Sequence, residues 1–330
     1  MTSNSSADKF GSSGHHSQIL AALPHAHQVI EVREQAKSAW AEAFQVRILD
    51  SQGLEHKYFM KTSYGHHGRE ALRGEFEGTS AIHAITPEFC PRPIAWGTFT
   101  SQPDTHFYLC KYFEFAEGIP SPSPFCEKLA RLHSRSCGLV DNFGFHCTTY
   151  NGDLPQDNTW CPSWEQFFSR GMRHVLRVRE TRAGPNPELE ALLPNLFDKV
   201  IPRLLRALES DGRKIKPSLI HGDLWYGNAS VIRKTGDPVI YDPACFWAHN
   251  EYELGNWHPE RNRFGKEFYQ EYHRHIPKSD PVEDYDDRNV LYGLRFNLHA
   301  ATLFPDKVEF LELVLRTLRY LTEKYQMNAE

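Results

Sequence analysis

The stretch that decides the fold is residues 221–228, which read His221-Gly222-Asp223-Leu224-Trp225-Tyr226-Gly227-Asn228. An aspartate stands two residues after a histidine, and an asparagine follows after four intervening residues. This H-x-D-x-x-x-x-N spacing is typical of a phosphotransferase catalytic loop. In such a loop the aspartate accepts the proton of the attacking hydroxyl, and the asparagine helps to hold Mg²⁺ beside the nucleotide phosphates. The stretch therefore predicts Asp223 as a catalytic base and Asn228 as a magnesium ligand.

The flanking sequence supplies the strands that such a loop needs. An apolar strand at 218–220 leads into it, and a hairpin follows, with a strand at 229–232 and a turn at 236–237. After the second strand comes Asp242, which has two readings. It is either a turn aspartate before a proline or a second metal carboxylate. Its position, one hairpin after the catalytic loop, favours the metal carboxylate.

Two charged residues upstream fit the same kind of site. Lys61 ends a short apolar strand at 57–61, and Glu75 lies in a helix expected over 69–85. A kinase-like site uses a lysine that reaches the nucleotide phosphates and a helical glutamate that fixes it. Such a pair is common and weak evidence alone. The order of strand lysine, helix glutamate, catalytic loop and second aspartate makes it specific.

The order of the elements predicts an α+β, bilobal protein-kinase-like fold, with a small strand-rich N-lobe and a larger helical C-lobe. Residues 1–27 are rich in Ser, Gly and His and are expected to form a disordered tail. We expect an N-terminal nucleotide-binding lobe at 28–110, a hinge at 111–115 and a C-terminal catalytic and substrate lobe at 116–330. In the C-lobe, apolar periodicity predicts helices at 123–132, 164–175, 193–208, 263–275, 288–303 and 307–325.

Composition excludes several functional classes. The 330 residues carry 37 basic and 42 acidic side chains, so no strong field favours nucleic acid or an anionic membrane. No run of about 18 apolar residues is present. The seven cysteines are scattered and form no C-x-x-C pair, which is typical of reduced thiols. We therefore expect a cytoplasmic protein that binds neither nucleic acid nor membrane. The sequence leaves the oligomeric state open.

The segment after Asp242 narrows the class of kinase. Protein kinases carry a long activation segment there that ends in A-P-E. No such segment follows here. A small molecule or sugar is therefore the favoured phosphate acceptor.

With these motifs in order, the chain resembles the fructosamine kinase family, also called ketosamine 3-kinases or protein-ribulosamine 3-kinases, which are related to aminoglycoside phosphotransferases and choline kinases. The family's H-G-D-L-W-x-G-N loop and its D-P-A-x-x-x-x-H-x-E segment both have counterparts here. So do its G-E-F segment, its L-A-x-L-H helix and its F-G-F…G-x-L-P-Q stretch. These matches lie at 221–228, 242–251, 74–76, 129–133 and 143–156, within a resemblance that covers roughly residues 55–305.

The resemblance implies phosphorylation of the 3-hydroxyl of a ketosamine, with ATP and Mg²⁺ as cofactors. The acceptor would be a glycated amine or a glycated protein, and loss of the unstable phosphorylated adduct would remove the sugar. Carried over by motif, Asp223 is the base. Asn228 and Asp242 bind Mg²⁺, Lys61 contacts the phosphates and Glu75 positions that lysine.

The same resemblance implies further binding residues. The backbone from Lys111 to Phe113 would form the hinge that reads adenine. Trp225 would form a wall against the sugar, although a core tryptophan is an equally fair reading. His249 and Glu251 would support the site or contact the sugar, and a purely structural histidine is the other reading of His249.

One segment departs from the pattern of the fold. The loop over the phosphates usually contains glycine, because backbone N–H groups approach phosphate most easily where no Cβ intervenes. The matching stretch here, 34–41, has none. Either Ser38 and the small alanines suffice, or nucleotide affinity is reduced, and no phosphate-loop residue is assigned. Two alternatives therefore stay open. One is a kinase for another hydroxyl, as in aminoglycosides or choline-like alcohols, and the other is a pseudokinase that binds a partner.

Overall fold

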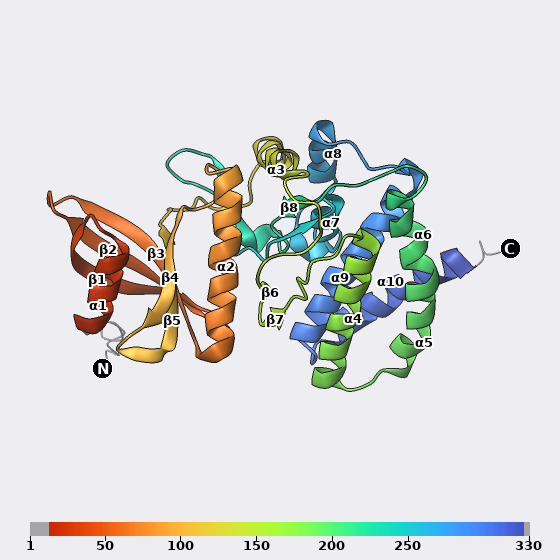
Figure 1. The fold of residues 1–330 in the computed structure, drawn as a ribbon, viewed down its shortest axis with the longest axis horizontal. Coiled ribbons are helices and arrows are strands. Elements are labelled where there is room, and N and C mark those ends of the chain that lie inside the picture. The colour runs from red at the N-terminus through yellow and green to blue at the C-terminus, as the bar shows by residue number, and fades with distance from the viewer. Residues whose placement is uncertain (1–12, 327–330) are drawn as a thin grey trace.

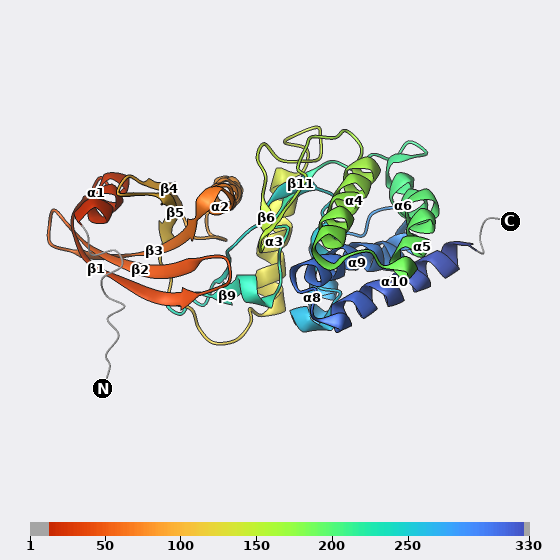
Figure 2. The same cartoon turned by 90° about the horizontal axis from the view of Figure 1, so that it is seen from below.

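The computed structural model describes residues 13–326 of the chain. A strand-rich lobe and a larger helical lobe lie side by side, and helix α2 lies between the sheet and the helical lobe (Figures 1 and 2). This arrangement confirms the bilobal α+β fold predicted from the sequence.

The smaller lobe is built on one five-stranded antiparallel sheet. Its spatial order is β1-β2-β3-β5-β4. The register places Lys61 of β3 opposite Ala43 of β2 on one side and Tyr108 of β5 on the other. Lys61 therefore lies on a central strand, where neighbouring strands fix its position. The strands are β1 (Ala26–Lys37), β2 (Glu42–Asp50), β3 (Glu55–Tyr64), β4 (Pro93–Phe99) and β5 (Gln102–Lys111).

The start of the chain differs from the prediction. Residues 13–27 are not a disordered tail, because they form helix α1 (Ser13–Ala22) and the beginning of β1. Ile19 and Leu23 are 0% and 2% exposed and belong to the core of the smaller lobe. Gln18 accepts a hydrogen bond from the backbone N–H of Thr100 at 2.6 Å. Two buried apolar side chains thus anchor a segment of polar composition. Residues 1–12 of the predicted tail lie outside the described residues.

We expect this helix to contribute to stability. Replacing Ile19 by Ala removes a fully buried side chain from the core of the smaller lobe, which costs about 2–3 kcal/mol of unfolding free energy. Chemical denaturation of both proteins measures the difference. A matched control is Leu54→Ala, since Leu54 is 57% exposed, and this change is expected to cost less than about 0.5 kcal/mol. Equal, small effects of both changes would contradict the anchored helix.

Helix α2 (Gly65–Ile85) carries Glu75 against the helical lobe. It starts four residues before the predicted helix and ends where predicted. A Cβ at Gly74 would come within 2.5 Å of the carbonyl oxygen of Thr148, and one at Gly78 within 3.1 Å of Cys245 Cβ. These two glycines let α2 lie directly on segments of the other lobe, next to the loop that holds Asp242.

The larger lobe is mostly helical. Its helices are α3 (Pro122–Ser136), α4 (Trp164–Ala183), α5 (Pro187–Asn195), α6 (Ile201–Leu205), α7 (Glu251–Gly255), α8 (Lys266–His275), α9 (Tyr285–Leu303) and α10 (Val308–Gln326). The predicted start of α3, with Ser123 as cap and Pro124 next, is two residues late, because Ser121 precedes Pro122. The helix predicted over 193–208 is interrupted by a π-helical turn, Leu196–Val200. Pro194 and Pro202 lack the N–H groups that a continuous α-helix requires.

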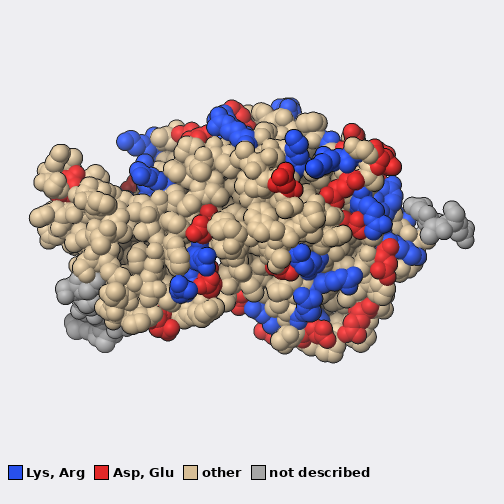
Figure 3. All heavy atoms as spheres, viewed as in Figure 1, with Lys and Arg blue, Asp and Glu red and all other residues tan. Residues whose placement is uncertain are grey.

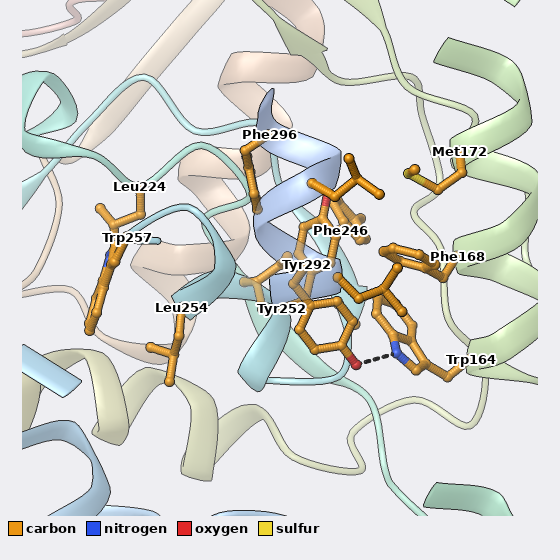
Figure 4. Close-up of a cluster of buried hydrophobic side chains, with 14 of the residues drawn as sticks. Trp164, Phe168, Met172, Leu224, Phe246, Tyr252, Leu254, Trp257, Tyr292 and Phe296 are labelled. Atoms are coloured by element: carbon orange, nitrogen blue, oxygen red, sulfur yellow. Dashed lines mark hydrogen bonds between the residues drawn. The ribbon is translucent and has the colours of Figure 1, made fainter. Parts of the chain in front are cut away.

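Aromatic side chains dominate the core beneath the catalytic loop (Figure 4). Trp164 is fully buried, and its indole N–H donates a 2.8 Å hydrogen bond to the hydroxyl of Tyr292. Tyr252 of α7 and Phe296 of α9 pack with ring centroids 5.1 Å apart. Leu224, the residue after Asp223, is fully buried in the same cluster. Core packing therefore fixes the backbone on which Asp223 sits.

Two short antiparallel ribbons hold the functional loops face to face. The first pairs β8 (Ser218–Ile220) with β11 (Phe246–Ala248), and the second pairs β9 (Ala229–Val231) with β10 (Pro238–Ile240). The loop 221–228 runs from β8 to β9, and the loop with Asp242 runs from β10 to β11. The predicted strands next to the two aspartates are confirmed as β8, β9 and β10. Strand β11 was not predicted. A third small ribbon joins β6 (Tyr150–Asn151) to β7 (Leu154–Pro155).

The surface and the thiols agree with the composition. On the face shown in Figure 3, basic and acidic side chains are interspersed over the helical lobe. All seven cysteines are free thiols, as predicted. Within residues 13–326, no helix combines the length and the apolar character needed to cross a bilayer.

Candidate active site

One cavity of about 970 Å³ occupies the space between the two lobes. Its walls combine β1–β3 and β5 with both functional loops and the C-terminal half of α9. Eight of the ten site residues singled out from the sequence line it: Lys61, Glu75, Lys111, Phe113, Asp223, Trp225, Asn228 and Asp242. Lys61 and Asp242, which are 181 residues apart in the sequence, thus meet in one cleft.

The start of the catalytic loop is held by a buried carboxylate that the sequence did not reveal. Glu253 of α7 is fully buried and accepts hydrogen bonds from the backbone N–H of His221 at 2.5 Å and of Gly222 at 3.0 Å. Gly222 has φ +78°, and a Cβ there would lie 2.3 Å from the carbonyl oxygen of Ala244. Only glycine fits this close approach of the two loops.

The motif histidine connects the same two loops. His221 is fully buried, and its Nε2–H donates to the carbonyl oxygen of Tyr241 at 2.9 Å, directly before Asp242. Its Nδ1 then accepts from the backbone N–H of Asp223 at 3.3 Å. Burial lowers the pKa of His221, so the neutral ring that these two bonds require is the stable form. The histidine positions both aspartates relative to each other.

Asp223 has the electrostatic setting of a proton acceptor. Burial raises its pKa to about 7, a change that Asn151 and Asn256 oppose by hydrogen bonding and that the negative charge of Asp242 reinforces. Asn256 Nδ2 lies 3.5 Å from Asp223 Oδ1. A carboxylate with a pKa near the working pH is both ionised in a useful fraction and basic enough to take a proton.

Asn228 and Asp242 present oxygen atoms suited to a hard cation. Asn228 Nδ2 donates to the backbone oxygen of Asp223 at 2.8 Å and to its Oδ2 at 3.2 Å, which leaves the amide oxygen as the atom able to bind metal. Among the described residues no group of three or more His, Cys, Asp and Glu side chains could hold a metal by itself. Two protein oxygens fit Mg²⁺, which takes its remaining ligands from phosphates and water.

Lys61 links both lobes through ion pairs. Its Nζ lies 2.8 Å from each carboxylate oxygen of Glu75 and 2.7 Å from Oδ1 of Asp242. Although burial disfavours the charged forms, the two carboxylates raise the pKa of Lys61, and Lys61 lowers the pKa of Asp242. Asp242 has φ +57°, a conformation that non-glycine residues adopt mainly where the surroundings enforce it. The contact between Lys61 and Glu75 expected from the sequence is present.

The hinge offers a free donor at one predicted position but not at the other. The backbone N–H of Lys111 donates to Arg92 O at 3.0 Å, so it is not free for a nucleotide. The N–H of Phe113 makes no backbone hydrogen bond within the described part of the chain. Beyond it, Phe115 stacks on Tyr241 with centroids 5.1 Å apart, which ties the hinge to the Asp242 loop.

The glycine-free stretch 34–41 comprises the end of β1 and the turn that leads to β2, and most of it lines the cleft. Ser38 Oγ accepts hydrogen bonds from the backbone N–H groups of Trp40 at 3.2 Å and of Ala41 at 3.0 Å. The serine thus satisfies donors that a glycine-rich loop would offer to phosphate. Ser63 Oγ donates to the carbonyl oxygen of Trp40 at 2.9 Å and fixes the tip of the turn over the cleft.

The opposite end of the cleft contains residues that the sequence did not identify. We call it the α9 end, lined by Asn256, Arg261, Asn262, Phe296, His299 and Phe310. It adjoins Asp223 through Asn256, whose side-chain oxygen accepts from Asn262 Nδ2 at 2.8 Å. Asn256 and Asp223 are 33 positions apart, so no local spacing reveals their contact. Trp225 also lines the cleft, half-buried and edge-on to Tyr226, which excludes a purely core tryptophan.

Two buried basic residues, His299 and Arg295, are in contact at the α9 end. His299 is 4% exposed, and its Nε2 accepts a hydrogen bond from Arg295, which can only donate. Burial and the adjacent Arg295 hold the pKa of His299 well below its usual value, so the neutral ring carries its proton on Nδ1. That Nδ1–H has no partner among the described residues. It is a buried donor in the wall of the cleft.

The prediction that His249 and Glu251 contact substrate is wrong. Neither lines the cleft, and both are 1% exposed. His249 bonds Tyr292 Oη and Ser279 Oγ, each at 2.9 Å. Glu251 accepts from the Ser279 backbone at 2.6 Å and from the fully buried Arg288 at 3.1 Å. They anchor α7 and the segment around Ser279 to α9, which favours the structural reading of His249.

The buried neutral histidine makes stability depend on pH. Burial lowers the pKa of His249 to about 4 from 6.5, partly opposed by Glu251. The unfolded chain therefore binds a proton in this window that the folded chain does not, so the unfolding free energy falls as pH drops from 6.5 towards 4. The His249 contribution to this loss is about 3 kcal/mol. Denaturation at several pH values, compared with His249→Gln, measures it. An unchanged slope in the variant would contradict the assignment.

The chain matches known proteins over most of its length. Residues 16–319 match the family model described as Fructosamine kinase. A protein-ribulosamine 3-kinase, chloroplastic, from Oryza sativa subsp. japonica is 30% identical over 268 residues, which cover 79% of this chain and 73% of that protein. A ketosamine-3-kinase from Mus musculus is 39% identical over 148 residues, 44% of each chain.

Solved structures agree in fold. A crystal structure described as a "putative fructosamine-3-kinase" from Thermobifida fusca has a TM-score of 0.72 at 22% identity and covers 93% of this chain and 98% of that one. An aminoglycoside phosphotransferase in ternary complex with AMP-PNP and hygromycin B has a TM-score of 0.61 at 11% identity, with 94% and 98% covered. At these identities the likeness establishes the fold alone.

Proposed function

The chain belongs to the fructosamine kinase family, and we propose that it transfers the γ-phosphoryl group of ATP to the 3-hydroxyl of a ketosamine. The acceptor is a sugar joined by an Amadori linkage to an amine or to a protein lysine. Phosphorylation makes this adduct unstable, so the sugar is released and the amine is regenerated. The protein thus acts in deglycation.

The observation that carries this proposal is the convergence of the charged groups on one cleft. Lys61 lies between Glu75 and Asp242, and Asp223 lies beside Asn228. Phosphoryl transfer depends mainly on positioning and on neutralising phosphate charge, and these groups supply both. A pseudokinase would not need all five groups to line one cleft.

We assign the roles as follows. Asp223 holds the acceptor hydroxyl and takes its proton. Lys61, fixed by Glu75, binds the nucleotide phosphates, and the Phe113 backbone N–H reads adenine. Asn228 and Asp242 would hold Mg²⁺, which when bound neutralises phosphate charge. Before nucleotide binds, Lys61 and Asp242 form an ion pair. Bound phosphates would replace part of this hydrogen bonding to Lys61.

The α9 end supports a sugar acceptor. Trp225 and Phe296 offer ring faces on which the C–H groups of a sugar can pack. None of the six residues that define this end is a carboxylate, and the end adjoins Asp223 through Asn256. An aminoglycoside carries several positive charges and would favour a more acidic wall, which argues for the ketosamine.

The test is ATP turnover by the purified protein with Mg²⁺ and a panel of acceptors. Ribulosyl-lysine and fructosyl-lysine are expected to be phosphorylated, whereas choline and an aminoglycoside are not. If only choline or the aminoglycoside were phosphorylated, that compound and not a ketosamine would be the acceptor. Binding of Mg-ATP without turnover on any member would contradict the proposal, as would failure to bind Mg-ATP, which a thermal-shift measurement detects.

A further inference from the structure

We infer that the α9 end of the cleft recognises a carboxylate on the amine part of the acceptor, through Arg261. On this basis the preferred acceptor is a low-molecular-weight ketosamine whose amine is a free amino acid, rather than a lysine within a protein chain. The inference rests on the proposed function and narrows its substrate class.

Arg261 stands close to the reacting position. It immediately precedes Asn262, which bonds Asn256, and Asn256 in turn lies 3.5 Å from Asp223 Oδ1. Arg261 lines the same cleft as Asp223 and Lys61, but it contacts Asn297 of α9 and Phe310 of α10, whereas Lys61 lies on β3 of the smaller lobe. An acceptor whose hydroxyl meets Asp223 therefore extends its remaining groups towards this arginine.

The guanidinium is held in place without a counter-ion. Arg261 Nη1 donates to Asn297 Oδ1 at 2.7 Å, and the guanidinium lies 5.1 Å from the ring centroid of Phe310. No carboxylate lies within 4 Å of it among residues 13–326. Burial lowers the pKa of Arg261. A partly buried cation with a fixed orientation and no anion is poised for an anionic ligand.

The other cleft carboxylates are already engaged elsewhere. Glu42 bonds Lys37 at 2.9 Å near the β1–β2 turn, whereas Glu75 and Asp242 bond Lys61. The buried Arg295 behind His299 adds positive charge at the α9 end, also without a carboxylate within 4 Å among the described residues. Both basic groups thus favour an anion at the end of the cleft that takes the acceptor.

A carboxylate matches the remaining donors. With Nη1 bound to Asn297, the guanidinium still offers N–H groups at Nε and Nη2, which can contact two oxygens of a planar carboxylate. A free amino acid carries such a group on the same molecule as the glycated nitrogen. In a protein the lysine α-carboxyl is part of a peptide bond and carries no charge.

The wild-type protein tests this inference with a pair of acceptors. The first is ribulosyl-glycine, with a free carboxylate, and the second is its neutral amide. We expect kcat/KM to be about 10- to 100-fold higher for the carboxylate, the range for a hydrogen bond to a charged group. Equal use of both acceptors would overturn the inference while supporting the proposed function. Use of neither would contradict the proposed function itself.

Variants then locate the recognition. Arg261→Gln is expected to reduce the preference to about one by raising KM for the carboxylate acceptor, with little change for the amide. The control, Arg316→Gln, removes the same charge from an exposed position on α10 and should retain the full preference. An equal loss on both acceptors in Arg261→Gln would mean that Arg261 acts on a common part of the reaction, and would overturn the inference. A further acceptor is a ketosamine 5-phosphate whose amine part carries no charge. If it were turned over faster than ribulosyl-glycine, the inference would also be overturned, because the anion recognised would then be a phosphate.

Discussion

Asp223→Asn is expected to lower kcat by about 10²- to 10⁴-fold, the range attributed to a positioned general base. The asparagine keeps the shape and the hydrogen-bonding reach of the aspartate but cannot accept a proton from the acceptor hydroxyl. Asn228 and Lys61 keep their positions, so Mg-ATP should still bind. Steady-state turnover on a ketosamine and a thermal shift with Mg-ATP measure the two properties separately.

The matched control is Asp211→Asn. Asp211 has the same charge and lies exposed in a turn with φ +53°, a conformation that asparagine also tolerates. This control should retain full turnover. Retention of more than about a tenth of wild-type kcat in Asp223→Asn would show that the aspartate is not the base, since that loss is smaller than the one attributed to this role.

The largest effect on stability is expected at the ion pair behind α7. Glu251→Ala would leave Arg288 fully buried without its carboxylate, and breaking a buried pair in this way costs about 3–5 kcal/mol. The backbone N–H of Ser279 would lose its acceptor as well. Denaturant unfolding followed by tryptophan fluorescence measures the loss.

An exposed pair provides the comparison. Glu114 lies 3.1 Å from Lys57, with both side chains accessible to water, and Glu114→Ala should cost less than about 1 kcal/mol. If Glu251→Ala were no more destabilising than this, the buried pair would not support the lobe. A variant that stays fully stable but loses ketosamine binding would instead restore the substrate role predicted for Glu251 from its motif.

The catalytic loop could be predicted because its chemistry dictates its spacing. A base and a metal-binding amide must face the same phosphates, so Asp223 and Asn228 recur at a fixed separation between two strands. Lys61 and Glu75 followed from the same requirement, together with the periodicity of the strand and the helix that carry them. Their mutual contact and their common cleft are present.

Motifs alone could not separate structural from ligand-binding residues. His249 and Glu251 belong to the same matched segment as Asp242, yet their side chains point into the core and bond Tyr292, Ser279 and Arg288. Whether a residue near a site faces the ligand depends on the path of the backbone. That path is set by long-range packing that no local spacing records.

Residues at the α9 end were missed for a related reason. Arg261 is oriented by Asn297, 36 positions away, and no carboxylate lies within 4 Å of it in the part of the chain that the structure describes. Helix α1 was missed because its composition is polar, whereas its order depends on Ile19 and Leu23 meeting the sheet. Both features arise from tertiary contacts rather than from pattern.

The central claim is that a ketosamine is phosphorylated at its 3-hydroxyl. Phosphorus-31 NMR of the reaction with ribulosyl-glycine and Mg-ATP tests this claim, because the scalar coupling between the new phosphorus and a sugar proton identifies the phosphorylated carbon. We expect a phosphate monoester on carbon 3 that disappears as free glycine forms. A phosphate at another hydroxyl, or no new phosphorus signal while ATP stays intact, would contradict it.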